Sequence, residues 1–145
     1  MTTVYDVSAS KLIDQASKEL KKFKEVSPPD WARFIKTGTG KENRPENKDW
    51  WYVRAASVLR KIYINGPIGI KRLSKRYSGK KNRGHKPEAR RRGSGSITKS
   101  IIRQLEALGF VKTTKRGRAI TPQGESFLDK VSHKVRKDIP GLDKY

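Results

Sequence analysis

The sequence has no cysteine among its 145 residues and only two histidines. The missing cysteine excludes disulfides, thiolate nucleophiles and zinc sites with cysteine ligands. His85 and His133 have no partner at ligand spacing, and neither a Gly-x-Ser-x-Gly elbow nor a phosphate-loop signature occurs. The carboxylates are scattered along the chain and do not form a pair in an apolar setting. We therefore expect no enzyme, metal site, cofactor or small-molecule substrate.

Acidic residues are scarce as well, since 14 Asp and Glu stand against 35 Lys and Arg and leave a formal net charge of +21. Self-repulsion on this scale disfavours an isolated globule, so the natural partner is a polyanion such as nucleic acid. A membrane surface is the other polyanion, but no apolar run could span a bilayer and residues 1–10 have no signal-peptide pattern. We expect a cytoplasmic protein that does not bind membranes.

Residues 49–63 are the stretch around which the chain is organised. At about 100° per residue, the helical period, apolar and basic residues separate onto two sides. The core side carries Trp51, Ala55, Val58, Leu59, Ile62 and Tyr63. The basic side carries Arg54, Ser57, Arg60 and Lys61. This predicts a central amphipathic helix, capped by Asp49 and ended by the turn at 65–67.

Two helices are predicted before the central one. Ser8 or Ser10 can cap a first helix that runs to about Lys24 with one apolar stripe. The Ser-Pro-Pro-Asp run at 27–30 predicts the start of a short second helix, with an apolar edge of Trp31, Phe34 and Ile35. A polar loop is expected over residues 37–48.

The segment after the central helix is the most basic in the chain. Residues 68–77 predict a short helix that buries Ile70, Leu73 and Tyr77. Residues 78–96 follow, and their glycines and Pro87 exclude a long helix, so a flexible or hairpin-like basic loop is expected. The arginines at 90–92 precede a Gly-Ser-Gly-Ser run, which suits either a phosphate cradle at a helix start or a flexible connector.

The remaining residues predict a compact C-terminal unit. Ser94 or Ser96 caps a helix that ends at Gly109, and two short strands at 110–114 and 119–121 are joined by a basic turn. Thr121-Pro122 starts a last helix, and residues 138–145 form a poorly ordered tail. This order is typical of a winged helix. We therefore expect a mainly α fold with one small β-hairpin, and one RNA-binding domain over residues 1–145.

Several short motifs together resemble a known family. They are the run at 50–57 (Trp-Trp-Tyr-Val-Arg-Ala-Ala-Ser), the segments at 77–79 and 92–94, the helix at 105–108, and the Thr-Pro-Gln-Gly start at 121–124. The chain resembles the archaeal and eukaryotic small-subunit ribosomal protein family numbered nineteen, in register over nearly its whole length. Because it lacks the eukaryotic type of C-terminal extension, it is more similar to the archaeal members.

The resemblance implies a winged-helix protein bound to ribosomal RNA in the head of the small subunit. Neighbouring small-subunit proteins would be further partners, and the family is linked to subunit assembly and precursor-RNA maturation. The chain would act on the cytoplasmic ribosome and be a monomer outside it. The family's basic positions map onto Arg54, Ser57 and Arg60, and onto the segment 90–96.

Taken together, the residues and the resemblance predict electrostatic docking onto folded RNA, with recognition of shape more than of base identity. The predicted RNA-binding residues are Arg54, Ser57, Arg60, Lys61, Lys71, Arg72, Lys75, Arg76, Lys80, Lys81, Arg83, Lys86, Arg90, Arg91, Arg92, Ser94 and Ser96. The alternative is a winged-helix DNA-binding transcription regulator that reads a groove with the helix at 96–108. That helix offers only Lys99, Arg103 and Gln104 for base edges.

Overall fold

The structure is a computed structural model and describes residues 2–138. Within this range the fold is mainly α, as predicted, with five α-helices and two antiparallel hairpins. The elements are α1 (Ala9–Leu20), α2 (Trp50–Asn65), α3 (Ile70–Arg76), β1 (Gly79–Arg83), β2 (Lys86–Arg91), α4 (Gly95–Ala107), β3 (Val111–Thr114), β4 (Gly117–Ile120) and α5 (Pro122–Asp138). Two 3-10 turns, η1 (Val4–Asp6) and η2 (Asp30–Arg33), precede α1 and α2. Apart from Asp138 at the end of α5, the predicted tail lies outside the described residues.

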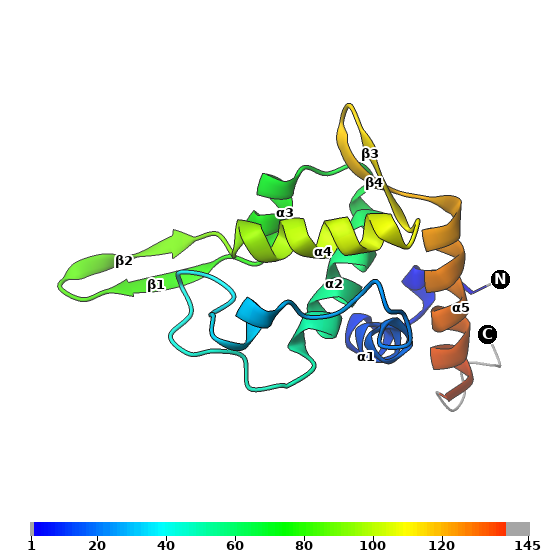
Figure 1. Cartoon of the computed structure of the whole chain (residues 1–145), viewed down its shortest axis with the longest axis horizontal. Helices are drawn as coiled ribbons and strands as arrows, with labels where there is room; N and C mark the ends of the chain where they lie inside the picture. Colours follow the sequence, from blue (N-terminus) through cyan, green and yellow to red (C-terminus); the bar gives the residue numbers. More distant parts are fainter. Residues whose placement is uncertain (1, 139–145) are drawn as a thin grey trace.

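Helix α2 occupies the centre of the molecule, and α1, α4 and β4 pack against it (Figure 1). Five of the six residues predicted for its core side are buried, namely Trp51, Ala55, Val58, Leu59 and Ile62. The sixth, Tyr63, is half-buried, and its hydroxyl donates a hydrogen bond to Asp129 Oδ1 of α5 over 3.0 Å. The amphipathic pattern therefore identified the core face of the central helix.

The two ends of α2 are formed differently from each other. Asp49 is at the N-cap position, but its carboxylate does not cap the helix. Oδ2 lies 2.5 Å from Lys21 Nζ, because the end of α1 brings this cation close. At the other end, Gly66 adopts φ 72° and terminates the helix, as predicted.

The predicted second helix is wrong in type and length. Residues 30–33 form only a single 3-10 turn. One of its four residues, Ala32, is buried, which is too little apolar burial to stabilise a longer helix. Pro29 and not Ser27 stands at the N-cap position, and no side chain caps the turn. The Ser27 carbonyl accepts a hydrogen bond from Gln104 Nε2 of α4 (2.7 Å).

The prediction of one β-hairpin is also corrected, because the fold has two. The expected C-terminal hairpin is β3–β4, and its turn is shortened to residues 115–116 because Gly117 and Arg118 pair within the strand. The second hairpin is β1–β2, within the segment that suited either a flexible or a hairpin-like loop. It projects along the long axis, away from the helices (Figure 1).

Candidate nucleic-acid interface

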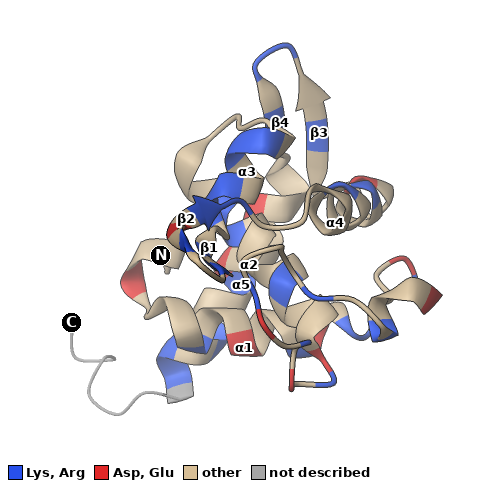
Figure 2. Cartoon of the chain, turned by 90° about the vertical axis from the view of Figure 1, so that its left-hand side faces the viewer, with Lys and Arg blue, Asp and Glu red and all other residues tan. Residues whose placement is uncertain are grey.

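Most of the predicted RNA-binding residues belong to three consecutive elements, α2, α3 and the β1–β2 hairpin. Figure 2, which looks onto the projecting end, shows blue Lys and Arg segments of α3 and the hairpin on the side that faces the viewer. We call this region the basic surface. It consists of Arg54, Arg60, Lys61, Lys71, Arg72, Lys75, Arg76, Lys80, Lys81, Arg83, Lys86 and Arg90.

A tyrosine ring fixes the α2 part of the basic surface. The Arg54 guanidinium carbon lies 3.9 Å from the centroid of the Tyr77 ring, and Lys61 Nζ lies 4.5 Å from it. The Tyr77 hydroxyl is 2.7 Å from Ser57 Oγ, which also accepts a hydrogen bond from Lys61 Nζ over 3.1 Å. These contacts hold two cations in fixed positions on α2. They also bury Ser57, whose predicted RNA contact stays a prediction.

This cluster brings positive charges close together in a position that is partly buried from solvent. Burial lowers the pKa of the Arg54 guanidinium. The pKa of Lys61 is lowered first by burial and then by repulsion from Arg60, Arg54 and Arg76. Burial raises the pKa of the Tyr77 hydroxyl against the opposing effects of Ser57 and Arg54. For Lys61, the repulsion by three neighbouring arginines shows that positive charges stand close together in this cluster.

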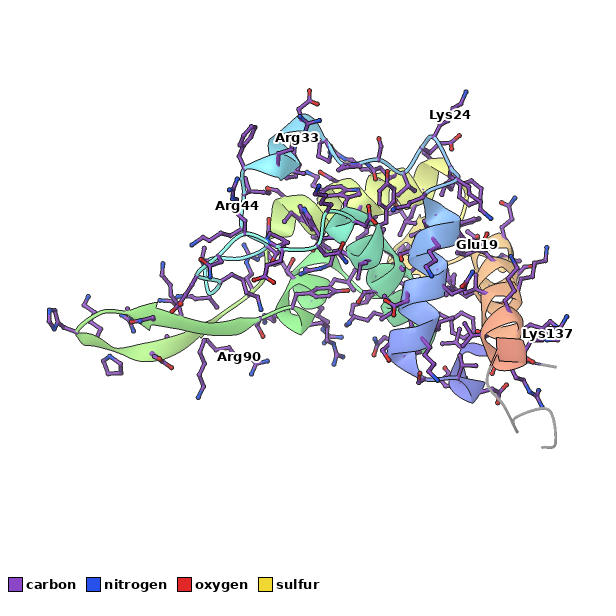
Figure 3. The ribbon with its side chains drawn as sticks, turned by 90° about the horizontal axis from the view of Figure 1, so that it is seen from below. Glu19, Lys24, Arg33, Arg44, Arg90 and Lys137 are labelled. Carbon is purple, nitrogen blue, oxygen red and sulfur yellow. The ribbon has the colours of Figure 1, made fainter. Side chains whose placement is uncertain are left out.

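In the described part of the chain, no cation of the basic surface forms an ion pair with a carboxylate. The ion pairs found there join Lys21 to Asp49, Lys22 and Lys134 to Glu19, and Arg118 to Glu106. Glu19 on α1 and Arg90 on β2 lie toward opposite ends of the molecule (Figure 3). The carboxylates that form these pairs therefore lie outside the basic surface, on α1, on α4 and next to the start of α2.

A cationic cleft lies between the end of α2, α3 and β2. Its volume is about 610 Å³, and Arg72, Lys75, Arg76 and Arg90 line it together with Asn65. The Arg90 guanidinium is oriented by a hydrogen bond from Nε to Ser78 Oγ over 2.6 Å. Four cations around one hollow are suited to a phosphate group of a nucleic-acid backbone.

The segment 93–96 is held in place and is not a free connector. Gly93 N donates to Ser74 O (2.9 Å), and Ser94 N donates to Thr37 O (2.8 Å). Ser94 caps α4 by accepting a hydrogen bond from Ile97 N, which decides between the two predicted caps. Two of the amides that a phosphate cradle would use are thus already bonded. The predicted contacts of Ser94 and of the exposed Ser96 stay predictions.

Glycine is required where the hairpin meets the body. A Cβ on Gly93 would lie 2.9 Å from Tyr77 Cβ and 3.1 Å from Tyr77 O. Gly93 also pairs with Gly38 in an isolated bridge, so the loop after η2 crosses the base of the hairpin. This close packing places Arg91 and Arg92, both exposed, beside the start of α4.

Two features of the site were missed by sequence reasoning. Tyr77 was expected to be a buried core residue, but it is half-buried and its ring carries Arg54 and Lys61. No local signal connects it to α2, because Tyr77 lies about twenty residues along the chain from its partners there. The second feature is the exposure of Trp31 and Phe34, which were predicted to form an apolar helix edge. The sequence did not reveal that this helix would be a single 3-10 turn, which leaves Phe34 outside it.

The helix that a DNA-binding regulator would use is α4, and one of its three candidate base-reading residues is already engaged. Gln104 Oε1 accepts a hydrogen bond from Trp51 Nε1 (2.8 Å), while its Nε2 bonds Ser27 O. Gln104 therefore links α4 to α2 and to the segment before η2, and its side chain is not available to contact a base edge. The alternative function is not favoured.

No group of three or more potential metal-ligating side chains is found within residues 2–138. In the same range, none of the helices is both long and apolar enough to cross a bilayer.

The fold and the site define a small, mainly α protein whose unpaired basic surface suits an extended polyanion. The sequence model of the family described as Ribosomal protein S19e matches residues 3–138. The chain belongs to the ribosomal protein S19e family. It is therefore a ribosomal protein and not an enzyme, and its place is the ribosome.

Relatives with similar sequences support this assignment. Small ribosomal subunit protein eS19 of Thermoplasma acidophilum is 43% identical over 99% of this chain and 95% of its own length. The protein of the same name from Aeropyrum pernix is 43% identical over 100% and 99%. Small ribosomal subunit protein eS19B of Schizosaccharomyces pombe is 39% identical over 94% and 96%. The resemblance read from the sequence motifs, archaeal members included, is confirmed.

Proposed function

We propose that this chain is a structural constituent of the small ribosomal subunit in the cytoplasm and binds ribosomal RNA in the head region through its basic surface. The names of the relatives support the subunit, since they are small-subunit proteins. In this role the chain also supports subunit assembly and precursor-RNA maturation, next to neighbouring ribosomal proteins. Outside the ribosome it is a monomer.

One observation carries the RNA-binding part of the proposal. The cations of α2, α3 and β1–β2 have no carboxylate partners within the described residues, although carboxylates do pair with cations elsewhere in the body. Unpaired cations that repel one another lower the stability of the free protein, and phosphates of RNA remove this repulsion and release their own counterions.

The arrangement supports recognition of RNA shape. Arg54 and Lys61 are fixed on Tyr77, so they present charge at constant positions, whereas the cations of the projecting hairpin can follow an adjacent strand. Arginines on a helix face cannot enter the deep, narrow major groove of an A-form duplex. We further propose that α3, α4, the β3–β4 hairpin and α5 form a winged-helix unit, and that the whole chain acts as one RNA-binding domain.

The proposal is tested by crosslinking the chain to total cellular RNA, followed by a moderate-salt wash and identification of the crosslinked RNA. We expect small-subunit ribosomal RNA attached to peptides from residues 54–61 and 71–96. A triple variant with Arg72→Gln, Lys75→Gln and Arg76→Gln removes three of the four positive charges that line the cationic cleft. It should lose most of the crosslinks to small-subunit RNA.

A matched control removes the same charge from the exposed side of the body, with Lys11→Gln, Lys18→Gln and Lys24→Gln. It should keep the crosslinks, because these lysines lie outside the basic surface. Net charge alone would then not explain the loss in the first triple variant. Equal losses in both triples would show non-specific attraction without a defined surface. Recovery of genomic DNA in place of small-subunit RNA would overturn the ribosomal role and favour the DNA-binding alternative.

A further inference from the structure

A second cleft, distinct from the cationic cleft, lies on the other side of the hairpin base. It has a volume of about 1040 Å³ and is bounded by the segment 31–39, the ends of the β1–β2 hairpin and the start of α4. Aromatic and cationic side chains line it together: Trp31, Phe34, Lys36, Lys81, Arg91 and Arg92. We call it the aromatic cleft.

The aromatic side chains of this cleft are unusually exposed. Phe34 is 76% exposed and Trp31 is 38% exposed. Among the described residues, Tyr5 is the one other large apolar side chain with comparable exposure, and it belongs to η1 at the N-terminal end of the chain. Trp31 packs edge-on against the buried Trp51, with ring centroids 5.8 Å apart and planes at 81°, so its position is fixed. Two exposed rings that line one hollow make this cleft a candidate binding site.

The charges of the cleft define what the rings bind. Four of its lining residues are Lys or Arg, and none of the described lining residues is Asp or Glu. The fitting ligand is therefore anionic and carries a flat apolar group. An RNA duplex keeps its bases inside the helix and would leave Phe34 uncovered, whereas an unpaired nucleotide offers both a phosphate and a free base face.

We propose that the aromatic cleft binds an unpaired nucleotide of RNA, with its base stacked on Phe34 and its phosphates against Lys36, Arg91 and Arg92. The proposal rests on the proposed RNA-binding function and deepens it. The basic surface is suited to the backbone of folded RNA, and the aromatic cleft adds a requirement for a bulge, loop or strand end beside it. Trp31, Phe34 and Lys36 are thereby assigned to RNA recognition.

The test uses the full chain and two RNA probes of matched length, a hairpin with an adenosine bulge and the same hairpin fully paired. Dissociation constants are measured at one fixed salt concentration. For the bulged probe, Phe34→Ala should weaken binding roughly 5- to 150-fold, the range expected for loss of one base stack. Affinity for the paired probe should change less than about twofold, since the phosphate contacts remain.

Three further variants separate stacking from other effects. Phe34→Trp keeps an aromatic face and should retain the affinity for the bulged probe, whereas Phe34→Leu keeps apolar bulk only and should lose it. Tyr5→Ala removes an exposed ring from the other end of the molecule and should have no effect on either probe. Because Phe34 is largely exposed, the melting temperature should be unchanged in all three Phe34 variants.

The possible outcomes separate this inference from the function on which it rests. If the native chain binds neither probe nor small-subunit RNA, the proposed function itself fails. If the native chain binds RNA but Phe34→Ala and Phe34→Leu leave binding of the bulged probe unaffected, the inference is wrong, because no base then stacks on Phe34. Equal weakening of both probes by Phe34→Ala would also overturn it, because stacking on an unpaired base cannot account for that.

Discussion

The two hairpins differ in length and in what holds them to the body. The β3–β4 hairpin buries Val111 and is tied to the body by two hydrogen bonds between Ile68 and Arg118 (N to O, 3.0 and 2.8 Å). Arg118 Nε also lies 3.2 Å from Glu106 Oε1 of α4. The β1–β2 hairpin has no buried residue and projects away from the helices.

This difference shows how the protein divides two tasks. A hairpin that buries apolar side chains contributes to the stability of the fold, and β3–β4 does so. The strands of β1–β2 consist largely of Lys and Arg, which gain nothing from the core and repel one another. The side chains of β1–β2 are therefore available to bind a polyanion. We expect substitutions in β1–β2 to change RNA affinity and those in β3–β4 to change stability.

The largest expected effect comes from removing charge from the projecting hairpin. In a triple variant with Lys80→Gln, Arg83→Gln and Lys86→Gln, each cation removed from a phosphate should cost at least about 1 kcal/mol, or roughly 10²-fold in affinity together. The slope of log affinity against log salt should fall by about one for each phosphate that is no longer neutralised. Binding to small-subunit RNA is measured by titration at several salt concentrations.

The control for this prediction lies on the other hairpin. Lys112→Gln, Lys115→Gln and Arg116→Gln remove the same charge from exposed positions of β3–β4 and its turn. We expect nearly native affinity and an unchanged salt slope. If both triples weaken binding equally, the two hairpins do not differ in function, and the comparison fails.

The next effect contrasts two glycines. Gly117 of β4 has φ 134°, and a Cβ there would lie 2.6 Å from the Ile68 carbonyl carbon, so Gly117→Ala forces the hairpin off the body. We expect a loss of about 2 kcal/mol or more in the free energy of unfolding, measured by chemical denaturation. Gly84, in the turn of β1–β2, has φ 72° and nothing within 4 Å of its Cβ position.

Gly84→Ala should therefore strain its own turn by about 1 kcal/mol without contacting any neighbour. Because this hairpin adds no core, the global unfolding free energy should be unchanged, while amide hydrogen exchange near residues 83–86 becomes faster. A large loss of global stability in Gly84→Ala would show that β1–β2 unfolds together with the body.

The contrast between the hairpins also marks what the sequence could reveal. Alternating and helical patterns of apolar residues predicted α1, α2, α4, α5 and β3–β4, because all of these bury a face. The β1–β2 segment lacks such a face, so its residues were compatible with either a hairpin or a flexible loop. Its place against the body includes the close approach of Gly93 to Tyr77, a contact set by tertiary structure.

The candidate site shows the same limit. Charge density and the basic side of the central helix identified Arg54, Arg60 and Lys61 as neighbours. The ring that organises two of them was not predictable, because Tyr77 comes from another element and its apolar character indicated a core position. Likewise, only the shortening of the second helix to η2 reveals that Phe34 is exposed.

A smaller effect is expected where the projecting hairpin joins the body. Tyr77→Phe removes the hydroxyl bonded to Ser57 but keeps the ring under Arg54 and Lys61. Loss of one partly buried hydrogen bond should lower the free energy of unfolding by about 1 kcal/mol. RNA affinity should stay native, since the cations keep their support. A Tyr77→Phe protein of native stability but weaker RNA binding would instead place the hydroxyl in contact with RNA.

The smallest effect concerns the paired charges of the body. Glu19 accepts a hydrogen bond from Lys134 Nζ over 2.9 Å, and this interaction lowers its pKa below the ordinary value of 4.5, against the opposing effect of burial. Since the folded state favours the ionised form of Glu19, the carboxylate stabilises the fold above its unfolded-state pKa. This stabilisation is lost as pH falls through the folded-state pKa.

Glu19→Gln should therefore lower the free energy of unfolding at pH 7 by less than about 1 kcal/mol, as is usual for a partly exposed pair. Denaturation at decreasing pH should bring variant and native protein together once the native carboxyl is protonated. Glu88→Gln is the matched control, because Glu88 is exposed among the cations of β2 without an ion pair, and it should leave stability nearly unchanged. A Glu19→Gln deficit that stays constant over the whole pH range would mean that Glu19 stabilises the body by packing. Ion pairs would then contribute less to the stability of the body than the comparison with the projecting hairpin implies.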